Sequence, residues 1–241
     1  MKASAFEFRF RYLIHVFIYV LAFAAPWNYW LHTDTIGTWQ WLAAQLARAH
    51  WLSFAAATNA VLIAAILVAT AGALLRLWGT AYLSAGVVQD RAMHGDRILA
   101  SGPYRHLRNP LYLGTFLSTL ALSTLMLPTA AVFAILAIGI FQIRLILAEE
   151  SFLTAKLGDA YKSYCAKVPR LLPAITPRVP DGGAKPNWGL AALAELLFLG
   201  TAVSFAALGW RYNAQLVVQG VVVSLGLSII AKAFIPKPAQ D

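Results

Sequence analysis

Two short polar stretches interrupt a chain that is otherwise mostly apolar. The first, GPYRHLRNPLYLG at residues 102–114, combines basic, aromatic and amide side chains, and the second, QIRLILAEE at residues 142–150, ends in two glutamates. Asn109 followed by Pro110 favours the start of a helix, with Asn109 as its N-cap and Pro110 at the first helical position. We therefore predict a helical hairpin between the two stretches, with its polar ends side by side.

The hairpin gathers side chains that could bind a small molecule near the inner membrane surface. The unpaired amides of a first helical turn favour an anionic group such as a carboxylate, and carboxylates accept from amines or paired hydroxyls. Taken singly, these residues have ordinary explanations as a helix start, a solvated glutamate pair and topology-setting arginines. Ionisable residues at the edge of a span are costly, however, and together they indicate a functional site. The expected members are Arg108, Asn109, Tyr112, Arg144, Glu149 and Glu150.

The composition places the chain in a membrane. Of its 241 residues, 60% are hydrophobic and 12% charged, about half the usual charged fraction of a soluble domain. The net charge of +9 comes from basic residues that flank apolar runs, which favours lipid headgroups over nucleic acid as the partner. The single cysteine, Cys165, and the scattered histidines give no spacing typical of a metal site.

The apolar runs predict an all-α, polytopic transmembrane helical bundle. A spanning helix needs roughly 20 apolar residues, and about six runs approach this length. With a cytoplasmic N-terminus, all lysines and arginines except Arg48 and Arg211 lie on the cytoplasmic side, so we expect both termini there. The alanine-rich composition suggests a bacterial inner membrane. The predicted spans are residues 12–31, 52–77, 111–127, 129–148, 188–209 and 214–235.

Three parts of the chain follow from this pattern. Residues 1–78 would form the first two spans, residues 79–173 a core with the helical hairpin, and residues 174–241 a linker and the last two spans. Within the core, apolar residues from Phe152 to Val168 recur at helical spacing with lysines between them, which predicts a cytoplasmic amphipathic helix on the bilayer or the core. Glu195, inside the fifth span, would pair with a polar or basic residue of another helix or line a substrate tunnel.

Residues 74–173 resemble the superfamily of isoprenylcysteine carboxyl methyltransferases and phospholipid methyltransferases. The resemblance lies in LLRLWGTAYL, then GPYRHLRNPLYLG, a hairpin, the glutamate pair, and FLTAKLGDAYKSYCAKVPRLLP in that order. Asn109 departs from the pattern, because many members have histidine there. Asparagine keeps a donor and an acceptor but cannot become positively charged, which argues against a proton shuttle at this position.

The resemblance implies an integral-membrane enzyme that uses S-adenosyl-L-methionine as cofactor, with residues 79–173 as its cofactor-binding catalytic core. Glu149 and Glu150 would bind its amino acid or ribose part. Arg144 would face the reaction centre or the substrate headgroup. Arg144 and Tyr112 are therefore the candidate catalytic residues. Tyr161, Tyr164 and Arg170 would close the pocket. The remaining cofactor contacts would come from Tyr104, His106, Leu107, Arg108, Asn109, Pro110 and Tyr112.

Several readings stay open at the level of the sequence. The methyl acceptor is an isoprenylated cysteine carboxylate, a phospholipid or other amine, or a small thiol. A transporter or headgroup-binding protein would have no cofactor pocket, and a sterol-reductase-like enzyme would use a nicotinamide cofactor in a longer chain. The lipid bilayer is the expected partner, and the oligomeric state is not indicated.

Overall fold

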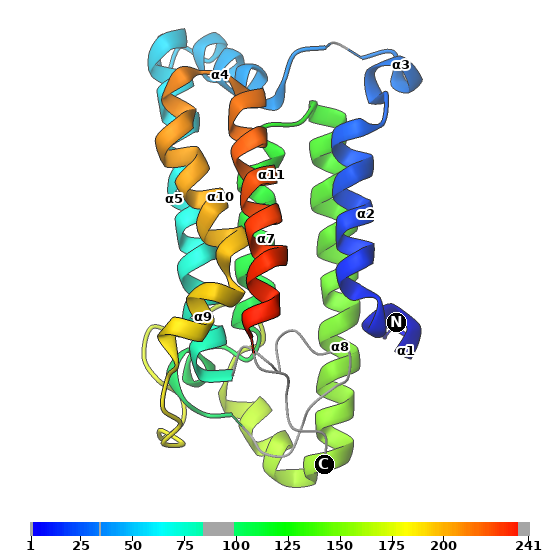
Figure 1. The fold of residues 1–241 in the computed structure, drawn as a ribbon, viewed down its shortest axis with the longest axis vertical. Helices are drawn as coiled ribbons and strands as arrows, with labels where there is room; N and C mark the ends of the chain where they lie inside the picture. Colours follow the sequence, from blue (N-terminus) through cyan, green and yellow to red (C-terminus); the bar gives the residue numbers. More distant parts are fainter. Residues whose placement is uncertain (1, 34, 84–98, 236–241) are drawn as a thin grey trace.

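The computed structural model describes residues 2–33, 35–83 and 99–235, and in these residues the chain is helical without strands. The long helices run roughly along one axis and form a bundle (Figure 1). The α-helices are α1 (Ala5–Arg9), α2 (Arg11–Ala24), α3 (Trp27–Leu31), α4 (Thr38–Arg48), α5 (Phe54–Leu83), α7 (Pro110–Ser123), α8 (Pro128–Lys167), α9 (Trp188–Ala194), α10 (Leu196–Leu208) and α11 (Ala214–Ala231). Short 3₁₀ turns lie at η1 (Gly102–Arg105), η2 (Gly209–Arg211) and η3 (Lys232–Phe234).

The all-α bundle is confirmed, but six spans are not. Within the described residues, three helices are long and apolar enough to cross a membrane: Phe54–Leu83, Pro128–Lys167 and Ala214–Phe234. A fourth results if α9 and the helix that follows it, which meet at a bend of 72°, count as one span. The helices α2 and α7 have 14 residues each, about 21 Å at 1.5 Å per residue, against a hydrocarbon core of about 30 Å.

The first predicted span is shorter than expected because a proline interrupts it. The helix α2 ends at Ala24, and Ala25 has an extended backbone with ψ of 143°. Pro26 explains this conformation, because a residue that precedes proline is pushed out of the helical region. The chain then forms the separate short helix α3.

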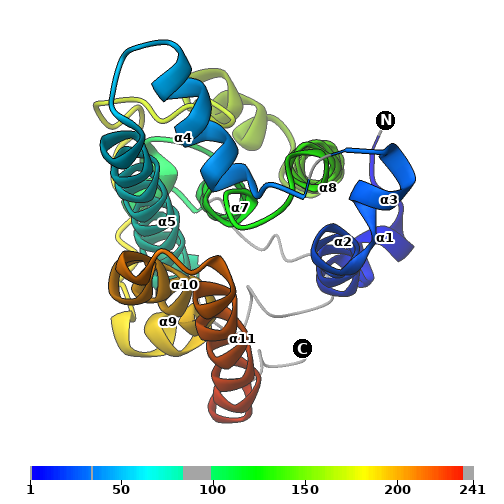
Figure 2. The ribbon, with the colours of Figure 1, turned by 90° about the horizontal axis from the view of Figure 1, so that it is seen from above.

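The predicted hairpin of the third and fourth helices is confirmed. Pro110 and Pro128 stand at the starts of α7 and α8, as expected from their fixed φ. In the view along the bundle, α7 lies inside, with α5 on one side and α8 on the other (Figure 2). The contact with α5 is the closest one, since a Cβ atom on Gly72 would lie only 2.7 Å from the carbonyl oxygen of Gly114. Small residues of this kind let membrane helices approach closely.

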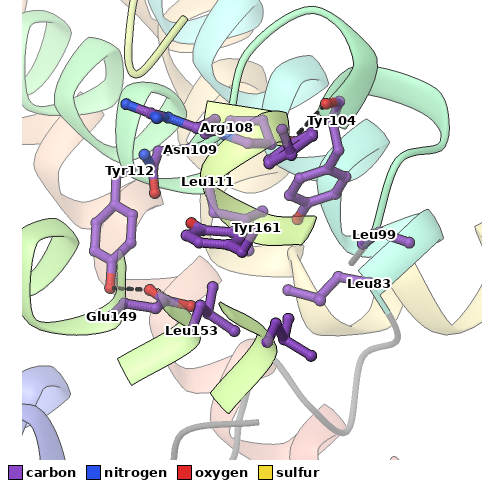
Figure 3. Close-up of a pocket in the computed structure, with 13 residues that line it drawn as sticks. Leu83, Leu99, Tyr104, Arg108, Asn109, Leu111, Tyr112, Glu149, Leu153 and Tyr161 are labelled. Atoms are coloured by element: carbon purple, nitrogen blue, oxygen red, sulfur yellow. Dashed lines mark hydrogen bonds between the residues drawn. The ribbon is translucent and has the colours of Figure 1, made fainter. Parts of the chain in front are cut away.

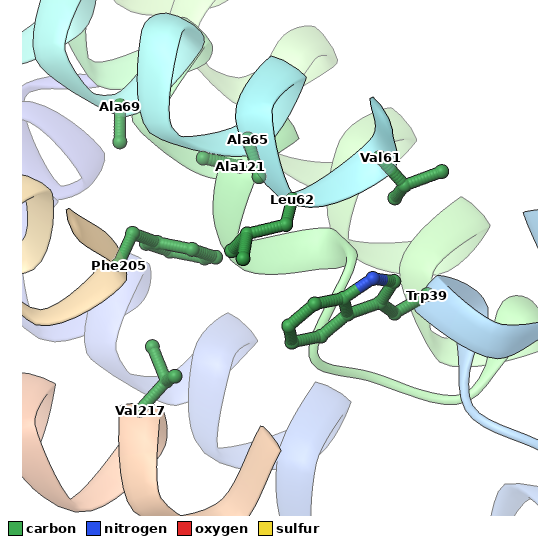
Figure 4. Close-up of a cluster of buried hydrophobic side chains, with 8 residues drawn as sticks. All are labelled: Trp39, Val61, Leu62, Ala65, Ala69, Ala121, Phe205 and Val217. Atoms are coloured by element: carbon green, nitrogen blue, oxygen red, sulfur yellow. The ribbon is translucent and has the colours of Figure 1, made fainter. Parts of the chain in front are cut away.

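An apolar core fills the end of the bundle beneath α4 (Figure 4). Phe205 and Leu62 are fully buried there, and Trp39 of α4 packs onto them. The indole Nε1 of Trp39 donates to the carbonyl of Thr58 at 3.0 Å, which satisfies its polar atom. This end is held by packing, whereas polar groups gather at the opposite end.

The helix α8 continues through the polar end of the bundle to Lys167. The segment predicted as a separate amphipathic helix is therefore its last part, redirected at Gly158, where φ is 58° and ψ is −135°. Tyr161 and Tyr164 are buried after this kink. A position of this segment on the membrane surface stays a prediction.

Residues 169–187, here called the strap, run back along residues 99–108. Backbone hydrogen bonds join the two segments: Arg108 N to Pro169 O at 2.9 Å, Ala174 N to His106 O at 3.0 Å, Arg178 N to Arg105 O at 2.9 Å, and Gly182 N to Ala100 O at 2.8 Å. Near its end, Ser101 donates to Asp181 at 2.6 Å, and this hydrogen bond lowers the pKa of Asp181. The strap thereby fixes the loop that precedes α7.

We predict that Gly158→Ala destabilises the protein. The backbone of Gly158 lies in a region that L-residues rarely adopt, at a cost of about 1–3 kcal/mol, although a new Cβ atom would meet nothing within 4 Å. Gly226→Ala is the matched control, because it has the same free space in the regular helix α11. Thermal unfolding in detergent should show a lower midpoint for Gly158→Ala alone, and equal midpoints would contradict the kink.

Candidate functional site

A cavity lies at the polar end of the bundle, between the start of α7 and the last part of α8 (Figure 3). Its volume between the described residues is about 110 Å³. Four tyrosines and a carboxylate give the wall both aromatic faces and charge, and leucines complete it. The lining residues are Leu83, Leu99, Tyr104, Arg108, Asn109, Pro110, Leu111, Tyr112, Glu149, Leu153, Leu157, Tyr161 and Tyr164.

Tyr112 and Glu149 meet across this cavity from the two helices of the hairpin. The Tyr112 hydroxyl donates to Glu149 Oε2 at 3.1 Å, and the dashed line beside the Glu149 label in Figure 3 marks this contact. Phe8 and Leu145 pack behind Tyr112 and limit where its ring can lie. The structure thus places the two polar stretches side by side and brings one of the two glutamates to the cavity.

Glu150 points elsewhere and binds the surrounding loops. Arg170 of the strap donates to it from Nη2 at 2.9 Å and from Nε at 3.1 and 3.2 Å, and this bonding raises the pKa of Arg170. Arg108 Nε lies 3.2 Å from Glu150 Oε1, but without the angle of a hydrogen bond. Adjacent helical residues point about 100° apart, which explains why the glutamate pair divides into two environments.

Asn109 does not cap α7 with its side chain, contrary to the expectation. It occupies the N-cap position, but its Nδ2 donates to Glu150 Oε1 at 3.3 Å and to the carbonyl of Arg170 at 3.1 Å. Its amide therefore connects α7, α8 and the strap by hydrogen bonds alone.

Tyr104, Tyr161 and Tyr164 line another part of the cavity wall. Tyr164 donates to the carbonyl of Tyr104 at 2.7 Å, and the rings of Tyr161 and Tyr164 lie 5.8 Å apart. Tyr104 is buried, and both its burial and the nearby charge of Glu149 raise its pKa well above the ordinary value. Tyr104 thus stays a neutral donor, with its hydroxyl 3.4 Å from the carbonyl of Gly79.

Arg144 is not brought to the cavity. It lies about 140° around the helix from Glu149, and its Nη2 binds both carboxylate oxygens of Glu7 at 2.8 Å. The pKa of Glu7 is lowered, first by the backbone amide of Ser4 and then by Arg144. The carbonyl of Arg144 also accepts from Ala3 at 3.0 Å. These contacts attach the N-terminal helix α1 to α8.

His106 and Leu107 also lie outside the cavity lining. His106 Nδ1 donates to the carbonyl of Ala174 at 2.8 Å, and its ring lies 5.9 Å from that of Trp78. Leu107 is fully buried. Both residues therefore hold the strap and the loop before α7, one step removed from the cavity.

The leucines of the wall were missed by sequence reasoning. Leu83, Leu99, Leu153 and Leu157 line the cavity, but in a chain with so many apolar residues a leucine carries no signal of its own. Leu153 and Leu157 follow Glu149 by four and eight residues, so helical periodicity from Glu149 could have found them. In the described residues, no group of three or more His, Cys, Asp or Glu side chains could hold a metal ion.

Residues 52–160 match the family described as phospholipid methyltransferase. The matched segment contains α5, α7, most of α8 and nearly all of the cavity wall. No curated protein sequence and no solved structure is significantly similar to the chain. The match covers less than half of the chain, and it confirms the resemblance to the isoprenylcysteine carboxyl and phospholipid methyltransferase superfamily.

We predict that Glu150→Ala lowers the free energy of unfolding by about 3 kcal/mol. Breaking a buried ion pair typically costs about 3–5 kcal/mol, and the Glu150 side chain is only 11% exposed, although Arg170 is 47% exposed. Asp159→Ala is the control, because its contact with Lys162 is at the surface and such pairs contribute little. Reversible unfolding in mixed detergent should separate the two variants; similar losses would contradict the structural role of Glu150.

Proposed function

We propose that this protein transfers a methyl group from S-adenosyl-L-methionine to a lipophilic or small acceptor at the polar end of the bundle. The observation that carries the proposal is the Tyr112–Glu149 pair in an aromatic cavity within the family-matched segment. The family implies methyltransferase activity, and the wall residues fit the cofactor that such enzymes use.

The donor and acceptor groups of the wall suit the parts of this cofactor. Glu149 can accept from its amine or ribose hydroxyls, and the tyrosine faces can bind its positively charged sulfur. Arg108 lines the cavity. Its Nε contacts Glu150 without a hydrogen bond, and its guanidinium can also pair with the carboxylate of the cofactor. The cavity volume is about 110 Å³, whereas pockets that bind small molecules have volumes of about 300–1,000 Å³. We therefore expect binding to widen the cavity.

The work left to the protein is mainly positioning. The cofactor, when bound, supplies a methyl group already activated by its positive sulfur. Tyr112 and Glu149 would orient it, and the leucines and tyrosines of the wall would exclude water from the transfer. A carboxylate acceptor is ionised at neutral pH and needs no base, whereas an amine or thiol must first lose a proton.

The acceptor class and the membrane orientation remain proposals. An isoprenylated cysteine carboxylate, a phospholipid amine and a small thiol all suit methyl transfer near a bilayer. We place the cavity and both termini on the cytoplasmic side because lysines and arginines concentrate there under this orientation. The alanine-rich composition favours a bacterial inner membrane. Mass spectrometry of lipids and thiols from cells that express the protein would identify the acceptor.

The proposal predicts that the purified protein binds S-adenosylhomocysteine in calorimetric titration. Glu149→Gln should weaken binding at least tenfold, because it removes the charge inside the cavity, and Tyr112→Phe should weaken it less. A tenfold loss corresponds to about 1.4 kcal/mol.

Glu7→Gln is the matched control, since this carboxylate pairs with Arg144 outside the cavity, and it should bind as the wild type does. Absence of binding to a folded wild-type protein would refute the cofactor assignment. Equal affinities in the wild type and both cavity variants would refute the site while leaving the family unaffected.

A further inference from the structure

Glu195 is a fully buried carboxylate in the joint between α9 and α10. Arg76 of α5 binds both of its oxygens, from Nε at 2.6 Å and from Nη2 at 2.9 Å. Thr80, one turn further along α5, donates to Oε1 at 2.5 Å. The expected partner on another helix is thus found, and no part of Glu195 lines the cavity.

The same arginine also holds the first turn of α7. Its Nη1 donates to the carbonyl of Leu111 at 3.2 Å and to Thr115 Oγ1 at 2.7 Å. The ring of Phe198 in α10 lies 3.9 Å from the guanidinium carbon. One guanidinium therefore connects α5, α7 and α10, and Glu195 fixes its orientation.

The turn held in this way carries one wall of the cavity. Asn109, Pro110, Leu111 and Tyr112 all line it, and the carbonyl of Leu111 belongs to the peptide bond that leads into Tyr112. Gly79 of α5 packs directly against Pro110 and Leu111. A shift of α7 relative to α5 would therefore move Tyr112 away from Glu149.

Stability alone does not explain a charged pair at this depth. Taking two charges out of water costs several kcal/mol, and apolar residues of similar volume are often as stable or more so. Apolar residues, however, could not hold the Leu111 carbonyl. What the pair adds is a defined position for the start of α7.

We propose that Glu195 is a positioning residue for the cofactor site, acting through Arg76 on the first turn of α7. This inference rests on the proposed function for its link to cofactor binding. Its structural half, the fixing of residues 111–115 by Arg76, stands on the hydrogen bonds alone.

The test compares an apolar replacement of the pair with a control that removes a different hydrogen bond to the same helix, α7. Arg76→Met combined with Glu195→Leu removes the pair at similar volume. Tyr19→Phe removes the 2.6 Å hydrogen bond between Tyr19 and Thr119, which also holds α7 but lies two turns from the cavity. For each protein in detergent, three quantities are measured: the unfolding midpoint, the affinity for S-adenosylhomocysteine, and hydrogen exchange of residues 110–116 without ligand.

We expect the double variant to keep an unfolding midpoint near or above that of the wild type. Its affinity should fall at least tenfold, and its 110–116 segment should exchange faster, whereas Tyr19→Phe should match the wild type in affinity and in this exchange. Unchanged affinity and exchange in the folded double variant would overturn the proposal.

Thr115→Val keeps the ion pair and tests the same idea if the double variant does not fold. It removes one of the two contacts of Arg76 Nη1 with α7, so exchange of residues 110–116 should rise and affinity should fall severalfold. No change in either quantity would overturn the proposal. If the wild type itself does not bind S-adenosylhomocysteine, the proposed function fails, while the exchange measurement still decides whether Arg76 holds α7.

Discussion

The polar end of the bundle depends on one constraint, the burial of the carboxylates of Glu150 and Glu195. A buried charge must be surrounded by donors, and here the donors come from segments far apart in the chain. Glu150 draws in Asn109 and Arg170 on one side of α7. Glu195 orients Arg76 on the other side. The first turn of α7 is held between these two networks, which leaves Glu149 and Tyr112 facing the cavity.

The sequence predicted those features that depend on neighbouring residues. Pro110 and Pro128 mark helix starts through their own backbone geometry, and the apolar runs between the polar stretches require a hairpin. The order of motifs from Leu74 to Pro173 was sufficient for the superfamily, which the family match then confirmed. The meeting of the 102–114 stretch with the glutamate pair followed from the hairpin alone.

Features that depend on distant residues were not predictable in the same way. Which of two adjacent glutamates faces the cavity depends on where α7 and the strap lie around α8. The charge of Arg144 and its place near the glutamate pair suggested a catalytic role. Its partner in the structure, Glu7, lies 137 positions away in the chain. The continuation of α8 through Gly158 depends on Tyr161, Tyr164 and Val168 packing together, which the sequence could only describe as an amphipathic pattern.

We propose that Glu149 binds the cofactor and that Glu150 supports the surrounding loops, which separates two residues that the motif alone treats as a pair. The most direct test is an experimental structure of the protein with S-adenosylhomocysteine. We predict ligand density in the cavity in contact with Glu149 and Tyr112, while Arg170 and Asn109 still bind Glu150. Density outside this cavity, or a ligand held by Glu150 with Arg170 displaced, would contradict the account.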